Sequence, residues 1–477
     1  MNFAEHVAVS SFELDSLDFK LPVRNFKILY KVAEEGKFSL TIEFLLRLLK
    51  ALNSVTIQDF SDFFGFTTEE ALHVVTSAER LGLVGRSADF IMLTEVGKSK
   101  FNTVTDEPSL YNVTNKTKAA FFDMLSFSPI EHDSLDHFAN TLPEIQILSP
   151  ELASNPIPSV KESFVKNYFE LVSHYRENNF KKSFIYAIDD IVPLNRSSVL
   201  VHLSVKLSSE NLNKLEIDFS GWKSTEELQD RLNIVDGCYN LIKNKTISIP
   251  RSMDFSVDFL QELSPQHIDK CLKDGKIDHV AFLNQVLKSR ENTDQQFVTR
   301  LFCGSVWCKE NTIDLLYLLN STKCEPVTNQ IWIKPDIEFW GCTTKLMPLI
   351  QSFFESGIDS TNTTAGNSYL MTSDKNLKTT QWRFKYHFNE IISPPYWDFP
   401  FNFEMLLIPN RVVVALCYLP LVAPVGFPIP LGLMSSDPDI VLVAHDYLQD
   451  LINNNLRNHE SHSSDLTSLK RLAKVIK

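Results

Sequence analysis

Residues 38–101 hold a succession of helix and turn signals that few folds can satisfy. Apolar residues at helical spacing predict a first helix built on Phe44, Leu45, Leu48, Leu49 and Leu52. Thr56 can cap a short second helix over residues 57–64, and Gly65 can adopt the positive φ of a tight turn after it. The pattern therefore predicts two helices, with a tight turn leading out of the second.

A third helix is expected directly after this turn. Thr67 or Thr68 can cap it, and Glu69 and Glu70 fall in its first turn, where the helix dipole favours acids. We expect it to end at Gly82. The side chains that should face the core are Ala71, Leu72, Val75, Ala78 and Leu81. The other positions of this helix would form an open surface.

Two short strands come next. Residues 83–86 and 90–97 are separated by a turn over residues 87–89. The run "LGLV…IMLTEVGKSKF" resembles the third helix and wing of the winged helix-turn-helix superfamily, and the resemblance covers residues 38–101 only. It implies a three-helix unit with a β-hairpin, of the kind that places its third helix in the major groove of DNA.

The resemblance implies DNA contacts from the third helix and the wing. The candidate residues are His73, Ser77, Arg80, Arg86, Lys98 and Lys100. The unit is nevertheless poor in cations, because residues 38–101 hold eight acids against six bases. Each missing phosphate contact removes affinity gained by counterion release. We therefore expect weak or assisted binding of duplex DNA, or docking on a partner protein instead.

The composition argues against several functions. A formal net charge of -13 does not suit a protein that coats nucleic acid, and only 14 of the 477 residues are glycine. No Gly-x-x-x-x-Gly-Lys-Ser/Thr or Gly-x-Gly-x-x-Gly phosphate loop occurs, and no Gly-x-Ser-x-Gly hydrolase motif occurs. We therefore expect no cofactor and lean towards a protein that is not an enzyme.

Three features bear on the compartment. Residues 412–434 are uncharged and long enough to span a membrane, but their four prolines would break a spanning helix. We expect a buried strand over residues 412–419 and a proline-rich loop after it. The seven cysteines lie singly in apolar surroundings, as buried free thiols of a reducing compartment do. The first residues lack the basic and apolar leader of an export signal, so we expect a cytoplasmic protein without a membrane span.

Changes of hydrophobic period predict an α+β, multidomain chain, with an N-terminal winged helix followed by one or two mixed αβ domains. We expect a lead-in helix over residues 23–35 and the winged helix within residues 1–104. A mixed αβ domain over 118–250 and an αβ domain over 251–454 should follow. A basic amphipathic helix over 464–477 should end the chain.

The mixed αβ domain should contain helices and one antiparallel hairpin. Apolar and polar residues alternate over residues 199–207 and again over 215–219, which predicts the hairpin. Helices are expected over residues 119–138, 160–177 and 225–243, with Thr225 capping the last.

The run "HDSLDH" is the densest group of potential metal ligands. On a helix, His132 and Asp136, or Asp133 and His137, would stand four residues apart on one face. We favour the simpler interpretation of a solvated amphipathic helix and expect no metal. A divergent metal-dependent nuclease stays an alternative; Pro335-Asp336 fits it weakly, because no strand-borne Asp/Glu-x-Lys follows.

Two basic features could form a secondary surface for phosphates or an acidic partner. Residues 382–388 alternate between aromatic and cationic side chains, which predicts a strand with one basic face. The C-terminal helix carries cations beside a leucine stripe. The cations of both features are Arg383, Lys385, His387, Lys470, Arg471 and Lys474. We favour the simpler interpretations, a strand with a wet face and a helix that closes the fold.

Residues 411–452, "RVVVALCYLPLVAPVGFPIPLGLMSSDPDIVLVAHDYLQDLI", are loosely similar to the last strand, loop and helix of phospholipase-D-like modules. Inactive modules of that family act as sensors in some winged-helix regulators. The catalytic form needs His-x-Lys, and none of the 12 histidines fits it. The resemblance therefore implies a non-catalytic module.

These observations favour a non-enzymatic winged-helix component of a prokaryotic DNA-linked system. It would be a regulator or an accessory subunit, with phage defence as one setting, and that setting rests on fold-level analogy. A divergent nuclease and a pure protein-interaction scaffold are the alternatives.

Overall fold

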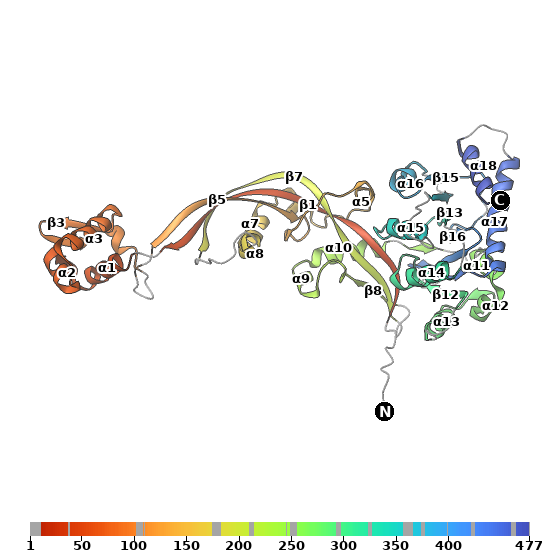
Figure 1. The fold of residues 1–477 in the computed structure, drawn as a ribbon, viewed down its shortest axis with the longest axis horizontal. Helices are drawn as coiled ribbons and strands as arrows, with labels where there is room; N and C mark the ends of the chain where they lie inside the picture. Colours follow the sequence, from red (N-terminus) through yellow and green to blue (C-terminus); the bar gives the residue numbers. More distant parts are fainter. Residues whose placement is uncertain are drawn as a thin grey trace, which may run out of the picture.

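The computed structural model describes residues 11–36, 39–101, 108, 110–173, 183–208, 214–244, 246–248, 255–291, 297–322, 327–355, 366–373, 377–397, 399–420, 425–458 and 464–476. They form an elongated α+β, multidomain protein, as expected from the sequence. A long β-sheet arm connects a helical unit (residues 39–101) at one end with a larger αβ body at the other (Figure 1).

The arm is built on β1 (Ser11–Gly36), a strand of 26 residues. It pairs antiparallel along almost its whole length with β7 (Ser183–Ser208), and its second half pairs with β5 (Leu110–Asp123). The short strands β6 (Pro129–Ile130) and β8 (Leu215–Asp218) complete the sheet order β6-β5-β1-β7-β8. At about 3.3 Å per residue such a strand spans roughly 85 Å. The helical unit, inserted between β1 and β5, is therefore held far from the body (Figure 1).

The lead-in helix expected over residues 23–35 is wrong, because these residues lie in β1. Their apolar side chains are buried with the period of two that a strand requires: Phe26, Ile28, Tyr30 and Val32. They pack against α7 (Ile157–Lys166) and α8 (Tyr168–Ser173) in a core of their own. These two helices occupy the range in which one helix over residues 160–177 was expected.

The helix expected over residues 119–138 is also wrong, because β5 continues to Asp123 and the chain then turns. The Asp123 carboxylate accepts the backbone N–H groups of Leu125 (3.0 Å), Ser126 (2.6 Å) and Ser128 (3.0 Å). These bonds hold the chain in a turn that a helix could not follow. Near the end of the range, α5 (His137–Thr141) is helical.

The antiparallel hairpin expected from the alternating pattern is confirmed. Leu207 of β7 lies opposite Leu215 of β8, and the strands continue in register to Asp218. The helix expected over residues 225–243 is divided into α9 (Thr225–Gln229) and α10 (Leu232–Lys243), and Ser224 rather than Thr225 caps α9. The expected domain limits at residues 104 and 118 stay a prediction, and strands from both sides of them share the arm sheet.

The body contains a seven-stranded mixed sheet in the order β12-β19-β17-β16-β13-β14-β15. Its strands are β12 (Thr299–Cys303), β13 (Asn329–Lys334), β14 (Asn367–Thr372), β15 (Glu390–Ile392), β16 (Phe403–Ile408), β17 (Val412–Pro420) and β19 (Pro428–Ser435). The longer helices packed around it are α11 (Phe255–Leu263), α13 (His279–Glu291), α14 (Lys309–Ser321), α15 (Leu346–Glu355), α16 (Leu377–Phe384), α17 (Pro438–Asn458) and α18 (Ser464–Ile476). Strands β13, β14 and β15 run parallel, and the other neighbours run antiparallel.

The buried strand expected over residues 412–419 is confirmed by β17, whose residues are all buried. The proline-rich loop expected after it is wrong in part, since Pro428 and Pro430 lie in β19. The pairing of β19 with β12 begins only at Leu431. The two prolines lie opposite Pro420 and Tyr418 of β17 but beyond the end of β12, so an N–H group missing on the β12 side interrupts no pairing with that strand.

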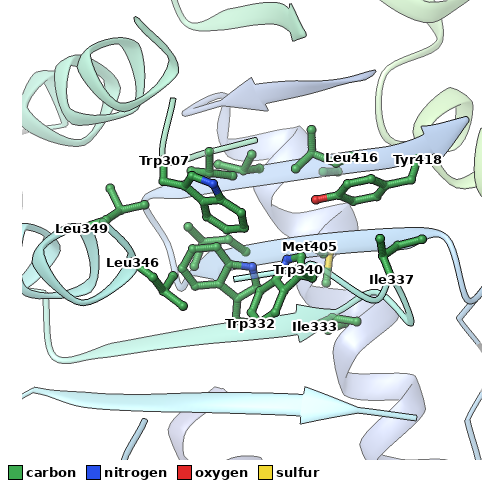
Figure 2. Close-up of a cluster of buried hydrophobic side chains, with 14 of the residues drawn as sticks. Trp307, Trp332, Ile333, Ile337, Trp340, Leu346, Leu349, Met405, Leu416 and Tyr418 are labelled. Carbon is green, nitrogen blue, oxygen red and sulfur yellow. The ribbon is translucent and has the colours of Figure 1, made fainter. Parts of the chain in front are cut away.

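The base of the arm and the body share one hydrophobic core. Figure 2 shows its centre, where Trp307, Trp332 and Trp340 lie close together beside Tyr418. Backbone bonds connect β1 to the body: Ser305 N–H donates to Leu14 O at 2.8 Å, and Asp18 N–H donates to Cys342 O at 2.8 Å. Six of the cysteines are buried and free, as expected, and Cys324 lies outside the described residues.

Candidate nucleic-acid interface

The helical unit has the order of elements expected of a winged helix. Its elements are α1 (Leu40–Leu52), β2 (Ser54–Thr56), α2 (Ile57–Phe64), α3 (Thr68–Arg80), β3 (Val84–Ser87), β4 (Phe90–Leu93) and α4 (Glu95–Lys98). The three strands form a small sheet in the order β2-β4-β3, and the three long helices enclose a separate core with it. The unit therefore carries the expected scaffold at the tip of the arm (Figure 1).

Both inner helices begin with a capping box. Thr56 caps α2 with Asp59, and Thr67 caps α3 with Glu70. Hydrogen bonds from each threonine hold the pKa of its acid, Asp59 or Glu70, below the usual value. Both acids therefore stay ionised, Asp59 at the start of α2 and Glu70 at the start of α3, and negative charge at these helix ends opposes binding of a polyanion.

The exposed side of α3 is partly apolar. Ala71, Val75 and Ala78 face the core as expected, but Leu72 is 42% exposed and Leu81 is 51% exposed, so the expectation that these two leucines point inward is wrong. Val74 takes the inward place instead, because it lies one turn before Ala78. His73 and Arg80 are exposed and Ser77 is half-buried. Leucine on this helix face offers nothing to a phosphate.

Two of the candidate cations, Arg86 and Lys98, have acidic neighbours. Arg86 Nε lies 2.8 Å from Glu79 Oε1, and its Nη2 donates to Glu79 Oε2 at 2.9 Å and to Thr76 Oγ1 at 3.2 Å. Lys98 lies 2.8 Å from Glu95. Lys100 is half-buried. The structure thus pairs Arg86 with an acid of α3 and Lys98 with an acid of α4, which compensates the charge of these two cations.

A surface of phenylalanine rings lies between α1 and the end of α2. The Phe64 ring contacts Phe44 at 5.8 Å, Phe63 at 4.9 Å and Phe66 at 5.8 Å between ring centroids. Phe63 is 70% exposed and Phe44 is 40% exposed, and the other two rings are half-buried. We call these four residues the aromatic patch. Contiguous exposed rings of this kind are typical of protein-interaction surfaces.

The expected secondary basic surface is altered by the fold. The strand expected over residues 382–388 is wrong, because α16 reaches Phe384 and a turn follows. Phe384 and Phe388 are four residues apart and both are buried. Four residues is the spacing of a helix face, and the alternation of aromatic and cationic residues in the sequence concealed it. Arg383 donates to Thr141 O at 3.3 Å, and burial lowers the pKa of His387 to about 4. These two residues therefore contribute to the interior rather than to a cationic face.

The other four residues of this set lie at the surface. Lys385 Nζ lies 4.6 Å from the Tyr386 ring centroid, and Arg471 on α18 lies 2.8 Å from Glu390. Lys470 and Lys474 are exposed on α18. The predicted role in binding stays a prediction for these cations.

The four potential metal ligands do not share a helix, so the expected amphipathic helix across them is wrong. His132 Nε2 lies 2.6 Å from Ser197 Oγ, and Asp136 caps α5 by accepting Ala139 N–H. His137 Nε2 lies 2.7 Å from Trp382 O. Asp133 borders a large groove beside the arm. Among the residues that the structure describes, no group of three or more His, Cys, Asp or Glu side chains is arranged to hold a metal ion.

The sequence reasoning missed two carboxyl groups near the junction of arm and body, the half-buried Asp15 and the buried Glu404. Asp15 accepts Trp307 Nε1 at 2.7 Å, and Glu404 accepts Trp332 Nε1 at 2.7 Å and the Tyr418 hydroxyl at 2.5 Å. Burial raises the pKa of each carboxyl to about 7, against the opposing effect of these bonds. A lone acid inside the apolar run of β16 was the available signal for Glu404.

Comparison with known proteins shows little similarity. No protein-family model and no curated protein matches the sequence. A solved structure of TrmBL2, described as an archaeal chromatin protein with a novel mode of DNA binding, is similar over 87% of this chain and 93% of that one. Its TM-score is 0.23 and the sequence identity is 9%, so the likeness supports no inference. In the described part of the chain, no helix has the length and apolar character needed to cross a membrane.

Proposed function

We propose that the chain is a non-enzymatic winged-helix component that docks on a protein partner through the aromatic patch, and that it binds duplex DNA only weakly by itself. The observation that carries this proposal is the aromatic patch: four phenylalanines in ring contact, two of them well exposed. The paired wing cations and the two acids of the capping boxes also support it, because they weaken the binding of duplex DNA by the helical unit. Membership in a prokaryotic DNA-linked regulator or defence assembly is part of the proposal and rests on fold-level analogy.

The chemistry of the partner follows from the rim of the patch. Asp62 precedes Phe63, and Glu69 lies at the start of α3 three residues after Phe66; both acids are exposed. A complementary partner surface therefore has apolar side chains at its centre and lysine or arginine opposite these two acids; Arg47, exposed one turn after Phe44, is already paired with Glu43 at 2.8 Å. Burial of the exposed rings would supply most of the affinity, and the charges would orient the partner.

Position-specific crosslinking tests this proposal in the full-length chain. A photoreactive phenylalanine at position 63 should crosslink to one discrete protein in nuclease-treated extract of the source cells. Phe44→Asp should abolish this crosslink, because it places a charge in the patch. Phe169→Asp is the matched control and should leave the crosslink intact. Phe169 lies on α8 of the arm and is 61% exposed, so the variant places the same charge on an exposed ring outside the patch.

Several outcomes would contradict the proposal. One is a crosslink from position 63 to nucleic acid rather than to protein when the extract is not treated with nuclease. Another is a protein crosslink that persists in Phe44→Asp, which would locate the contact elsewhere. A third is nanomolar binding of duplex DNA at physiological salt, which would restore the DNA-binding function.

A further inference from the structure

A cavity of about 210 Å³ opens at the junction of arm and body. Five separate segments line it: Asp15 and Leu17 of β1, residues 246–247, residues 336–340 after β13, Tyr418 of β17, and residues 427–428. It lies next to the tryptophan core, and Figure 2 shows Tyr418 pointing towards that core with Trp340 and Ile337 close by. Anything bound here would touch both the strand that runs to the helical unit and the sheet of the body.

The walls of this cavity are aromatic. Phe339, Trp340, Tyr418 and Phe427 line it, and all four side chains are buried in the protein. The Trp340 ring is held by contacts with Trp332 at 5.8 Å and Trp307 at 5.9 Å. The cavity wall therefore presents several aromatic rings, whose negative faces attract a cation; Lys334 Nζ already lies 6.0 Å from the Trp340 ring centroid, so the other rings matter more for a ligand.

The charged lining residues all have the same sign. They are Asp15, Asp336 and Glu338, and no lysine, arginine or histidine is among the residues that line the cavity. Asp15 is half-buried whereas the other two acids are exposed; it accepts Trp307 Nε1 at 2.7 Å, and burial raises its pKa to about 7. The repulsion from Glu404 adds to this rise. A positive charge in the cavity would favour the ionised form of Asp15 and would therefore lower this raised pKa.

We propose that this cavity binds a small organic cation, an ammonium group carried on an apolar or hydroxylated stem. The aromatic walls would surround the methyl or methylene groups next to the nitrogen, and Asp15 would neutralise its charge from the inner side. Asp336 and Glu338, which are exposed at the rim, would attract the cation from solution. A carboxylate or phosphate ligand would meet three acids and no base.

Calorimetric titration of the full-length chain tests this proposal with choline and ethanolamine as probes. The matched control ligand is 3,3-dimethylbutanol, which has the shape of choline without its charge. Choline or ethanolamine should bind at least tenfold more tightly than the neutral analogue or acetate. Because a bound cation favours the ionised form of Asp15, binding near pH 7 should release protons, and the measured heat should change with the ionisation enthalpy of the buffer.

Three variants test whether the cation occupies this cavity rather than an acidic surface elsewhere on the protein. Asp15→Asn should weaken binding about tenfold and abolish the buffer dependence, and Phe427→Leu should weaken it about threefold by removing one ring. If Asp15→Asn fails to fold, the rim double variant Asp336→Asn with Glu338→Gln replaces it, and this variant should also weaken cation binding. Asp62→Asn, an exposed acid on the helical unit, is the matched control and should change nothing. Equal binding of the neutral analogue, or cation binding that all variants retain, would overturn the proposal.

Discussion

Arg86 of the wing lies against Glu79 of α3 in a two-pronged ion pair, with Nε 2.8 Å from Oε1 and Nη2 2.9 Å from Oε2. The guanidinium group of Arg86, the best candidate for a phosphate contact, therefore binds an acid of the helical unit instead. It fastens the wing to the third helix. The side chains are both about a third exposed, so the pair contributes modestly to stability, but it removes a cation from the candidate DNA-binding surface.

The first prediction concerns this pair. Glu79→Gln should release Arg86 and make DNA binding tighter and more sensitive to salt. One added phosphate contact steepens the slope of log affinity against log salt by about 0.9. Fluorescence anisotropy of a labelled duplex over a salt series measures this slope.

Asp62→Asn provides the control for the charge itself. It removes one negative charge from α2, as Glu79→Gln does from α3. Asp62 accepts a hydrogen bond from Gln58, whose side chain is neutral, so this variant releases no cation from that bond. If both variants steepen the slope equally, net charge and not the release of Arg86 is responsible.

The second prediction separates the aromatic patch from the core beneath it. Phe60 is fully buried in the core of the helical unit, whereas Phe63 is 70% exposed. Phe60→Ala should lower the opening free energy of the unit by about 3–5 kcal/mol, and Phe63→Ala should change it by less than about 0.5 kcal/mol. Amide hydrogen exchange of α1 and α3 measures both. A comparable loss in the two variants would show that Phe63 is a structural residue.

The third prediction concerns pH and the base of the arm. Asp18 accepts His202 Nδ1 at 2.6 Å, and it also accepts Thr344 Oγ1 at 2.7 Å. The bond that His202 donates to Asp18 raises the pKa of His202 above 6.5, although burial and Lys345 oppose the rise. Burial works to raise the pKa of Asp18, but the bond and charge of His202 and the bonds from Thr344 outweigh it and lower the pKa below 3.8.

The sign of the pH effect follows from these two shifts. The contribution of His202 is complete below pH 6.5 and is lost as the pH rises through its raised pKa. The contribution of Asp18 is complete above pH 3.8 and is lost as the pH falls through its lowered pKa. His202→Gln should therefore lower the melting temperature most between these limits and least in alkaline solution. A difference that stays constant from pH 5 to pH 9 would contradict this assignment.

The fourth prediction concerns the turn that ends β5. Asp123 is fully buried, and Arg231 Nη1 lies 3.3 Å from its carboxylate. Asp123→Ala should destabilise the arm by about 3–5 kcal/mol, because it leaves the Arg231 charge without its partner. The double variant Asp123→Ala with Arg231→Met should recover part of this loss. Chemical unfolding followed by tryptophan fluorescence, to which Trp222 contributes, measures the change in stability. A double variant that recovers no stability would contradict the role of the pair.

The helical unit could be predicted from the sequence because its signals are local. Thr56, Gly65 and Thr67 cap or end helices through atoms a few residues away, and the structure has them in those roles. The error at Leu72 and Leu81 has a physical cause, since both leucines were assumed to be buried, whereas single apolar side chains are common at protein surfaces.

The arm could not be predicted in the same way. β1 is stabilised by partners far away in the sequence, since Phe19 pairs with Val201 and Lys27 pairs with Ala119. Local periodicity cannot reveal such partners, and residues 23–35 also contain enough helix-forming residues to suggest a helix. The cavity was missed for the same reason, because Asp15, Asp336 and Phe427 meet only after the arm has packed on the body.

Equilibrium binding of the full-length chain to a duplex of about 30 base pairs at 0.15 M salt tests most directly whether the helical unit holds DNA by itself. Its paired cations and its acidic, partly apolar third helix predict a dissociation constant of about 1 μM or weaker, unchanged by Phe63→Asp. A nanomolar constant that charge reversal at Arg80, Lys98 and Lys100 weakens would contradict the docking function and assign this surface to DNA.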